Sequence, residues 1–239
     1  MDKSVSIIIP AYNEEKKLSP TADLVFASLL KNGISDFEII IFDDASTDKT
    51  GEVADDLAMQ FSQIKVVHNA RNMNLGFNIT RGFQLATKEY VGFVPGDNET
   101  APESLDNILQ VLGKADIIIP YIKNPEVRSL TRRFLSTTYV MIINAAFGFR
   151  MRYYNGLCFF KTSMVQKVPV LTYGFAYMTE ILVKMLKSGA TFVEAPMVLK
   201  TRERGATKAF RLKNIASVFK TFFTLFWEVQ ILRKRVVLA

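Results

Sequence analysis

The sequence predicts an α/β protein built on a mostly parallel β-sheet, and three observations support this class. Short apolar runs alternate with segments of helical periodicity through the first 120 residues. Strands and helices that alternate in this way form βαβ units, which produce parallel sheets. The chain has 239 residues, of which 49% are hydrophobic, so it can bury the core of one full domain.

The expected elements follow one another in a regular order along the chain. Strands are expected at residues 4–9, 37–42, 64–67, 90–94 and 116–119, and helices at residues 18–32, 49–61, 75–87 and 102–112. The pattern changes after Tyr121. A strand at residues 155–161, a helix at 177–187 and a strand at 191–194 are expected there, and a helical tail begins at residue 210.

Residues 134–149 form an uncharged segment bounded by arginines, and its sixteen residues include Val140, Met141, Ile142 and Ile143. A bilayer span needs roughly 17–25 apolar residues, so this segment falls just short. Two interpretations stay open: a helix buried in the core, or a helix lying in a membrane interface.

Charge is divided unevenly between the two halves of the chain. Residues 1–120 carry 10 basic and 18 acidic side chains, whereas residues 121–239 carry 20 basic and 5 acidic side chains. An acidic half can hold a cation, and a basic half can bind phosphates or an anionic surface. Nucleic acid is not expected as a partner, because no recognition helix or aromatic RNA-binding signature is present.

The scarcity of soft metal ligands limits the chemistry. Cys158 and His68 are the single residues of their types, which excludes an internal disulfide and a zinc or multi-histidine site. Any metal must therefore be held by carboxylates. The chain opens directly into a strand-like run without a basic and apolar leader, which indicates a cytoplasmic location.

Polar residues follow three of the expected strands, in the ranges 10–14, 43–48 and 97–99. Ligands of open α/β sheets bind beyond the carboxyl ends of the strands. Asp97 and Glu99 are hard oxygen ligands one residue apart, which suits Mg²⁺ or Mn²⁺. The alternative is a plain loop with an Asx turn at Asp97 and a solvated Glu99.

The runs SIIIPAYNEE, FEIIIFDDASTDKT, YVGFVPGDNETAPE and TRERGATK together resemble glycosyltransferase family 2. The likeness is greatest to the dolichyl- and polyprenyl-phosphate sugar transferases. This resemblance implies a GT-A, Rossmann-like fold over residues 1–208 and a basic amphipathic helix over residues 209–239. It also implies a nucleotide-diphosphate sugar donor, a polyprenyl phosphate acceptor and a divalent Mg²⁺ or Mn²⁺.

The resemblance also assigns residues to the donor site. It implies that Pro10, Tyr12 and Glu14 line the nucleobase and ribose pocket, where a carboxylate can accept hydrogen bonds and Tyr12 can stack. Asp44 and Gly96 complete this substrate-binding set. For Asp44 the alternative is turn or helix-cap chemistry.

At the metal position the sequence departs from the D-x-D-x-Q pattern of the family. Pro95 replaces the first Asp and Glu99 replaces the Gln, while Asp97 is retained. The number of carboxylates is thus preserved. Asp97 is expected to be the principal metal ligand, with Glu99 beside it and phosphate oxygens of the donor completing the shell.

Basic residues are expected to bind the phosphates. Arg202 and Lys208 match the catalytic phosphate-binding pair of the family, with a solvated basic loop as the alternative. Arg133 and Ser136 resemble, more loosely, its acceptor-phosphate residues. Arg152 stands four residues before Gly156, where many inverting relatives carry an Asp near the acceptor, and is expected to attract the acceptor phosphate.

The tail joins a Phe-rich helical face to basic side chains, which is typical of interfacial helices. The chain is therefore expected to be peripheral on the inner, cytoplasmic face of an anionic membrane. The predicted reaction is transfer of a sugar to a polyprenyl phosphate. Transfer to a saccharide hydroxyl in surface polysaccharide synthesis, or an inactive nucleotide-binding scaffold, are the alternatives.

Overall fold

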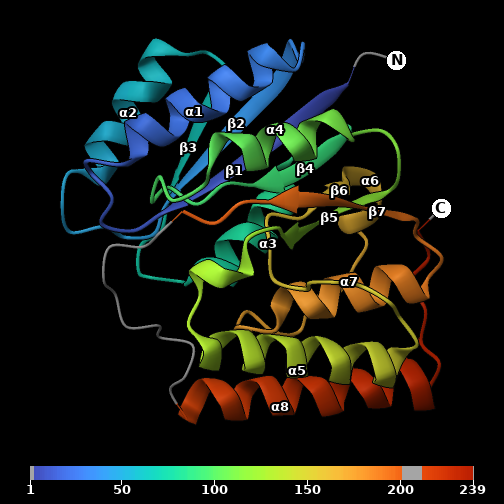
Figure 1. Cartoon of the computed structure of the whole chain (residues 1–239). Coiled ribbons are helices and arrows are strands. Elements are labelled where there is room, and N and C mark those ends of the chain that lie inside the picture. Colours follow the sequence, from blue (N-terminus) through green and yellow to red (C-terminus); the bar gives the residue numbers. More distant parts are fainter. Residues whose placement is uncertain (1–2, 201–211, 239) are drawn as a thin grey trace.

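The computed structural model describes residues 3–200 and 212–238 and contains one seven-stranded sheet in the order β3-β2-β1-β4-β6-β5-β7. Figure 1 shows helices covering both faces of this sheet. The strands are β1 (Ser4–Ala11), β2 (Asp36–Asp43), β3 (Ile64–His68), β4 (Tyr90–Phe93), β5 (Ile117–Ile122), β6 (Phe159–Lys161) and β7 (Phe192–Met197). The mostly parallel α/β fold predicted from the sequence is confirmed.

Helices connect the strands in the expected alternation. They are α1 (Leu18–Lys31), α2 (Thr50–Gln60), α3 (Leu75–Leu85), α4 (Pro102–Gln110), α5 (Leu130–Phe147), α6 (Thr162–Val165), α7 (Tyr177–Lys187) and α8 (Leu212–Phe226). A 3₁₀ turn (Pro125–Val127) precedes α5, and a π turn (Trp227–Ile231) follows α8. Figure 1 shows α1, α2 and α4 on one face of the sheet and α3, α6 and α7 on the other.

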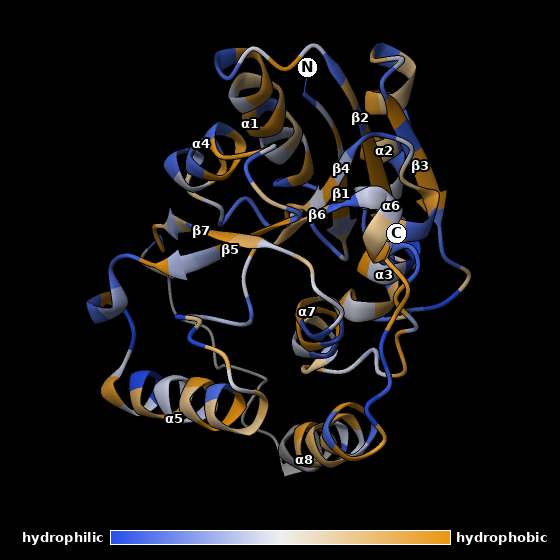
Figure 2. Cartoon of the chain, turned by 90° about the vertical axis from the view of Figure 1, so that its right-hand side faces the viewer, coloured by the Kyte–Doolittle hydropathy of each residue, from blue (hydrophilic) through white to orange (hydrophobic). Residues whose placement is uncertain are grey.

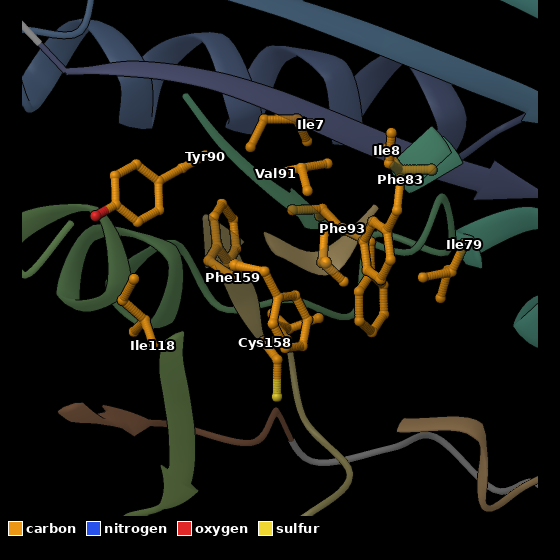
Figure 3. Packing of buried hydrophobic residues seen from close by; sticks show 14 of the residues in the cluster. Ile7, Ile8, Ile79, Phe83, Tyr90, Val91, Phe93, Ile118, Cys158 and Phe159 are labelled. Atoms are coloured by element: carbon orange, nitrogen blue, oxygen red, sulfur yellow. The ribbon is translucent and has the colours of Figure 1, made fainter. Parts of the chain in front are cut away.

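Strand β1 lies at the centre of the parallel part of the sheet. Ile7 pairs with Ile39 of β2 and with Gly92 of β4, both in parallel register. Residues from Val5 to Ala11 are buried throughout, because β1 is covered by helices on both faces. In Figure 3 the ring of Phe159 lies between the side chains of Tyr90 and Phe93 in this core.

Strand β6 interrupts the parallel order, because it runs antiparallel to both β4 and β5. It is also shorter than the strand expected at residues 155–161. The N–H of Cys158 donates to the carbonyl of Gly156 over 2.8 Å, so the backbone turns there and enters the sheet only at Phe159.

Helices α5 and α8 form an outer layer beyond α7, seen at the bottom of Figures 1 and 2. The ring of Phe147 in α5 meets the rings of Phe222 and Phe226 in α8, with centroids 6.2 and 6.1 Å apart. Gln230 donates to the carbonyl of Ala146 over 2.6 Å. The two helices are therefore packed side by side at their carboxyl ends.

The interpretation of residues 134–149 as a core helix is wrong. In α5 only Ile143 and Phe147 are buried. The exposed large side chains of this helix are Leu130, Phe134, Leu135, Met141 and Ile142. Among residues 3–200 and 212–238, no helix is long and apolar enough to cross a bilayer.

The carboxylate of Glu38 joins four segments at the end of the sheet opposite the three strand-end loops. It accepts hydrogen bonds from Ser6, Thr87 and Lys65 over 2.7–2.8 Å. Burial alone would raise the pKa of Glu38, but these hydrogen bonds, with that of Lys65 first, lower it to about 2. Helix α3, expected to reach residue 87, ends at Leu85, and Thr87 donates to Glu38 instead of continuing the helix.

We expect Glu38→Gln to lower the free energy of unfolding by about 2 kcal/mol at pH 7, because Lys65 loses its partner and one buried carboxylate oxygen is replaced by a donor. The folded-state pKa lies below the unfolded value, so this contribution is complete above about pH 4.5 and is lost as the pH falls towards 2. Urea titrations between pH 3 and pH 7 measure it. The exposed Glu52→Gln is the control, and an equal loss for both variants would contradict the assignment.

Candidate functional site

The loops that follow β1, β2 and β4 lie together at one edge of the sheet. The N–H of Asp44 donates to the carbonyl of Ala11 over 2.9 Å, and the N–H of Gly96 donates to the carbonyl of Pro10 over 3.0 Å. Both bonds continue the parallel ladders beyond the strand ends. The expected meeting of the three strand-end segments is therefore confirmed.

The first and second loops are tied to each other by hydrogen bonds. Asn13 receives the N–H of Thr47 on its side-chain oxygen over 2.8 Å, and its own N–H donates to the hydroxyl of Ser46 over 3.0 Å. The N–H of Glu14 donates to the hydroxyl of Thr50 over 2.7 Å. Asn13 and Ala45 adopt left-handed φ values of 56° and 60°, which are uncommon outside glycine and concentrate at functional sites.

The three predicted donor-site residues of the first loop differ in their exposure to solvent. Tyr12 is 45% exposed, so its ring is open to a stacking partner. Glu14 is half-buried and pairs with Lys17 over 3.2 Å. Pro10 is buried in β1 and contributes its carbonyl to Gly96. Their roles in binding a nucleotide stay predictions.

Asp44 is buried and anchors the loop between β3 and α3. Its Oδ1 accepts from the N–H of Met73 over 2.7 Å and from the side-chain amide of Asn69 over 2.8 Å. Its Oδ2 accepts from the N–H of Asn74 over 3.0 Å. Each carboxylate oxygen offers two lone pairs, so Oδ2 keeps room for one more donor. These are long-range bonds that anchor a loop, and they differ from the local turn or helix-cap chemistry weighed as the alternative for Asp44.

Asp43 and His68 form a second polar pair that was not singled out as a site from the sequence. Asp43 accepts from the N–H of Ser46 and lies 3.0 Å from Nδ1 of His68, whose Nε2 lies 3.1 Å from Asp55. Burial alone would raise the pKa of Asp43, but the bonds from Ser46 and His68 hold it below its usual value. Asp43 and then Asp55 raise the pKa of His68. The parallel register of β2 with β3 places these residues opposite each other.

The third loop contains the expected metal ligands. The N–H of Glu99 donates to Oδ1 of Asp97 over 3.1 Å, which is the Asx turn foreseen as the plain-loop alternative. Asn98 has a φ of 52°, its N–H donates to Thr21, and its carbonyl accepts from Lys200 over 2.9 Å. Glu99 is half-buried and not simply solvated as that alternative supposed.

Gly96 allows the third loop to approach β1 closely. A Cβ at this position would lie 3.1 Å from Cβ of Ala11 and 3.2 Å from the carbonyl oxygen of Pro10. Both distances are tighter than ordinary van der Waals contact, so a larger residue would push the loop away. Gly96 therefore sets the position of Asp97 and Glu99 relative to the first loop.

A divalent metal is compatible with the donor set of this loop. In the described part of the chain no three His, Cys, Asp or Glu side chains gather as a metal site. The described residues therefore offer a small carboxylate set here, from Asp97 and Glu99. Mg²⁺ commonly binds through one or two carboxylates and completes its shell with water and substrate phosphates.

The basic residues expected at the acceptor side lie on α5. Ser129 caps this helix by accepting the N–H of Arg132 over 3.4 Å, and no acidic residue occupies the first turn. Arg133 is exposed and Ser136 is half-buried. The amino end of a helix attracts anions, and here two arginines add to that effect.

Arg152 is already engaged in the structure. Its Nε lies 2.7 Å from Glu194, and its guanidinium stacks 3.3 Å from the ring centre of Tyr121. A carboxylate partner neutralises part of the charge expected to attract an acceptor phosphate, so the geometry weakens that prediction. Arg202 and Lys208 lie outside the described residues, in the gap between Lys200 and Leu212.

The chain belongs to glycosyl transferase family 2, whose model matches residues 6–174. It is 28% identical over 237 residues to a dolichol-phosphate mannosyltransferase from Pyrococcus furiosus, covering 95% of this chain and 65% of that protein. It is 30% identical over 155 residues to an undecaprenyl-phosphate 4-deoxy-4-formamido-L-arabinose transferase from Pectobacterium atrosepticum, covering 64% of this chain and 47% of that protein. The chain thus spans about half to two thirds of these relatives.

A solved structure confirms the GT-A architecture. Glucosyl-3-phosphoglycerate synthase from Mycobacterium tuberculosis, solved with Mn²⁺, UDP and glucosyl-3-phosphoglycerate, superposes with a TM-score of 0.61 at 16% sequence identity. The alignment covers 95% of this chain and 79% of that chain. At this identity the likeness establishes the fold.

We expect His68→Gln to lower Tm by about 2–3 °C at pH 5.5 and by much less at pH 8.5. The folded-state pKa of His68 is raised, so its contribution is complete below the unfolded value of 6.5 and is lost as the pH rises through the folded value. Thermal unfolding of both proteins at the two pH values measures the difference. An equal loss at both values would show that charge on His68 is not the cause.

Proposed function

We propose that this chain is a metal-dependent glycosyltransferase that moves a sugar from a nucleotide-diphosphate sugar to a polyprenyl phosphate at the cytoplasmic face of a membrane. One observation carries the proposal: a carboxylate-bearing strand-end site shares the molecule with an outer layer of two helices that expose apolar side chains. The names of the two relatives support the acceptor class.

The donor would bind at the three strand-end loops. Tyr12 offers a ring for the nucleobase, and Glu14 and Asp44 offer acceptors for ribose or base hydrogens. Asp97 and Glu99 would hold Mg²⁺ or Mn²⁺ against the diphosphate. The metal, when bound, neutralises the charge that develops on the departing nucleoside diphosphate. The solved relative contains Mn²⁺ and UDP together, which supports this arrangement.

The acceptor phosphate would bind near the amino end of α5, where Arg132 and Arg133 extend. A lipid phosphate is already an anion at neutral pH, whereas a sugar hydroxyl needs a base to become a nucleophile. Residues 148–158 contain no carboxylate. The only acidic partner found for this segment, in the described part of the chain, is Glu194, which binds Arg152. These features favour a phosphate acceptor over a saccharide hydroxyl. Arg202 and Lys208 are proposed to clamp the donor phosphates.

The outer layer would lie on the membrane surface. The exposed apolar residues of α8 and the turn after it are Phe219, Phe223, Trp227, Ile231 and Leu232. Those of α5 are exposed as well, and Arg133, Arg150 and Lys220 are exposed around them. Apolar side chains that enter the headgroup region, together with basic residues that face anionic lipids, form a peripheral membrane surface.

We expect Asp97→Ala to lower the turnover of nucleotide sugar by about two orders of magnitude, and EDTA to abolish turnover in the unaltered chain. The assay presents UDP- and GDP-linked hexoses with undecaprenyl or dolichyl phosphate in Mg²⁺ or Mn²⁺. Asp56→Ala, an exposed position on α2, is the control. Full activity in EDTA would refute the metal assignment, and transfer only to oligosaccharides would support the polysaccharide alternative.

We expect the double variant Phe223→Ser and Trp227→Ser to bind anionic vesicles at least about tenfold more weakly, because each buried aromatic contributes about 1.5–3 kcal/mol. Sedimentation with phosphatidylglycerol-containing vesicles at two salt concentrations measures this binding. Met59→Ser removes an apolar side chain on α2 that is 79% exposed, against 64% for Phe223 and 58% for Trp227, and serves as the control. Unchanged sedimentation of the double variant would exclude the outer layer as the docking surface.

A further inference from the structure

Helix α7 contains a buried ion pair that lies outside the strand-end site. Glu180 is 2% exposed and Lys184 is 7% exposed, and Nζ of Lys184 lies 2.6 Å from Oε1 of Glu180. Removing two charges from water is costly, and apolar residues of similar size often stabilise such a position equally well. The pair is therefore better explained by what it holds in place.

The pair holds the backbone of the loop before α7. Oε1 of Glu180 accepts the N–H of Leu171 and Oε2 accepts the N–H of Thr172, each over 3.0 Å. Lys184 donates to the carbonyl of Pro169 over 2.7 Å. Both charged groups thus fix the same short stretch, and the geometry of residues 169–172 depends on them.

This loop presses against the first turn of α3. A Cβ on Gly76 would lie 2.4 Å from the carbonyl oxygen of Tyr173, so only glycine permits the approach. The ring of Tyr173 also meets that of Phe77 edge to face, with centroids 5.3 Å apart. Residues 73 and 74, just before α3, donate to Asp44. A continuous set of contacts therefore runs from Glu180 to the strand-end site.

On its other side the pair reaches the C-terminal segment. Oε2 of Glu228, in the π turn after α8, lies 3.7 Å from Nζ of Lys184, and its Oε1 lies 3.1 Å from Lys234. The N–H of Val236 donates to the hydroxyl of Ser188 at the end of α7. Glu228 is 19% exposed and binds both lysines at once, with the longer of the two distances to Lys184.

We infer that Glu180 and Lys184 are positioning residues that couple the C-terminal helix to the loop at residues 169–175. Glu228 makes the contact on the side of the C-terminal helix. From residues 169–175 the coupling continues to the loop at residues 69–74, which binds Asp44. The coupling gives the outer layer a means of influencing the donor site. This influence on the donor site rests on the proposed function, because docking of the outer layer on a membrane would be the event that displaces α8. The contacts themselves do not depend on the identity of donor or acceptor.

Hydrogen exchange on the full chain tests the coupling without a substrate. Glu228→Gln removes one charge at a partly exposed position and keeps its size, and Glu103→Gln removes an exposed carboxylate on α4 that pairs with Lys123. We expect Glu228→Gln to speed amide exchange several-fold at residues 171–172 and 73–76, because local opening of the loop becomes easier. Glu103→Gln should leave these amides unchanged. Faster exchange confined to residues 226–238 would overturn the inference.

A double variant separates positioning from stability. Glu180→Gln with Lys184→Met removes both charges with little change in volume, and it leaves one N–H of residues 171 and 172 facing an amide donor, which is the same kind of change as Glu38→Gln. We expect a lower urea midpoint, comparable to that of Glu38→Gln, but faster exchange at residues 171–172 in the double variant alone, together with weaker calorimetric binding of UDP or GDP in MnCl₂. Unchanged exchange in this variant would overturn the inference. If the double variant does not fold, the exchange result for Glu228→Gln decides.

The two hypotheses fail in different ways. Absence of UDP and GDP binding to the unaltered chain would count against the proposed donor site, while the exchange experiments would still decide the coupling. Normal nucleotide binding with no long-range change in exchange for Glu228→Gln would remove the coupling and leave the proposed function intact.

Discussion

The parallel register of β1 between β2 and β4 is the constraint on which the site depends. Because all three strands run in the same direction, their carboxyl ends lie at one edge, and hydrogen bonds from Asp44 and Gly96 extend the ladders into the loops. The loops therefore begin from fixed positions. Side chains from residues more than 80 positions apart in sequence meet there without a dedicated binding domain.

The loops then hold one another by local polar contacts more than by apolar packing. Asn13, Ser46, Thr47 and Thr50 link the first two loops, and Asp44 ties the second to the residues before α3. Left-handed backbone at Asn13, Ala45 and Asn98 recurs in all three loops. Such conformations cost free energy, and they persist only where the surrounding hydrogen bonds overdetermine them. A preorganised edge of this kind loses little entropy when a ligand binds.

The basic side chains of the second half of the chain have more than one role in the structure. Part of its charge is paired within the protein, as in the buried pair of Lys184 with Glu180 and the partly exposed pair of Arg152 with Glu194. Other basic side chains, such as Arg133 and Lys220, are exposed on the outer helices beside exposed Phe and Leu side chains. Within the described residues, the excess of basic side chains therefore includes both groups held in ion pairs and exposed groups on the outer helices.

The sequence by itself determined the α/β class, most element positions and the three strand-end loops, because burial on both faces gives parallel strands near-continuous apolar runs that end at polar residues. The sequence also indicated that Asp97 and Glu99 place two carboxylates after the fourth strand, because residue types and their spacing can be read without knowing the fold. Tertiary structure alone decided that α5 gives only Ile143 and Phe147 to the core, that Arg152 pairs with Glu194, and that Glu180 holds a loop nine residues before it. Hydrophobicity does not distinguish a core face from a membrane or partner face, and a charge does not reveal its partner. Those facts depend on which distant segments fold against one another.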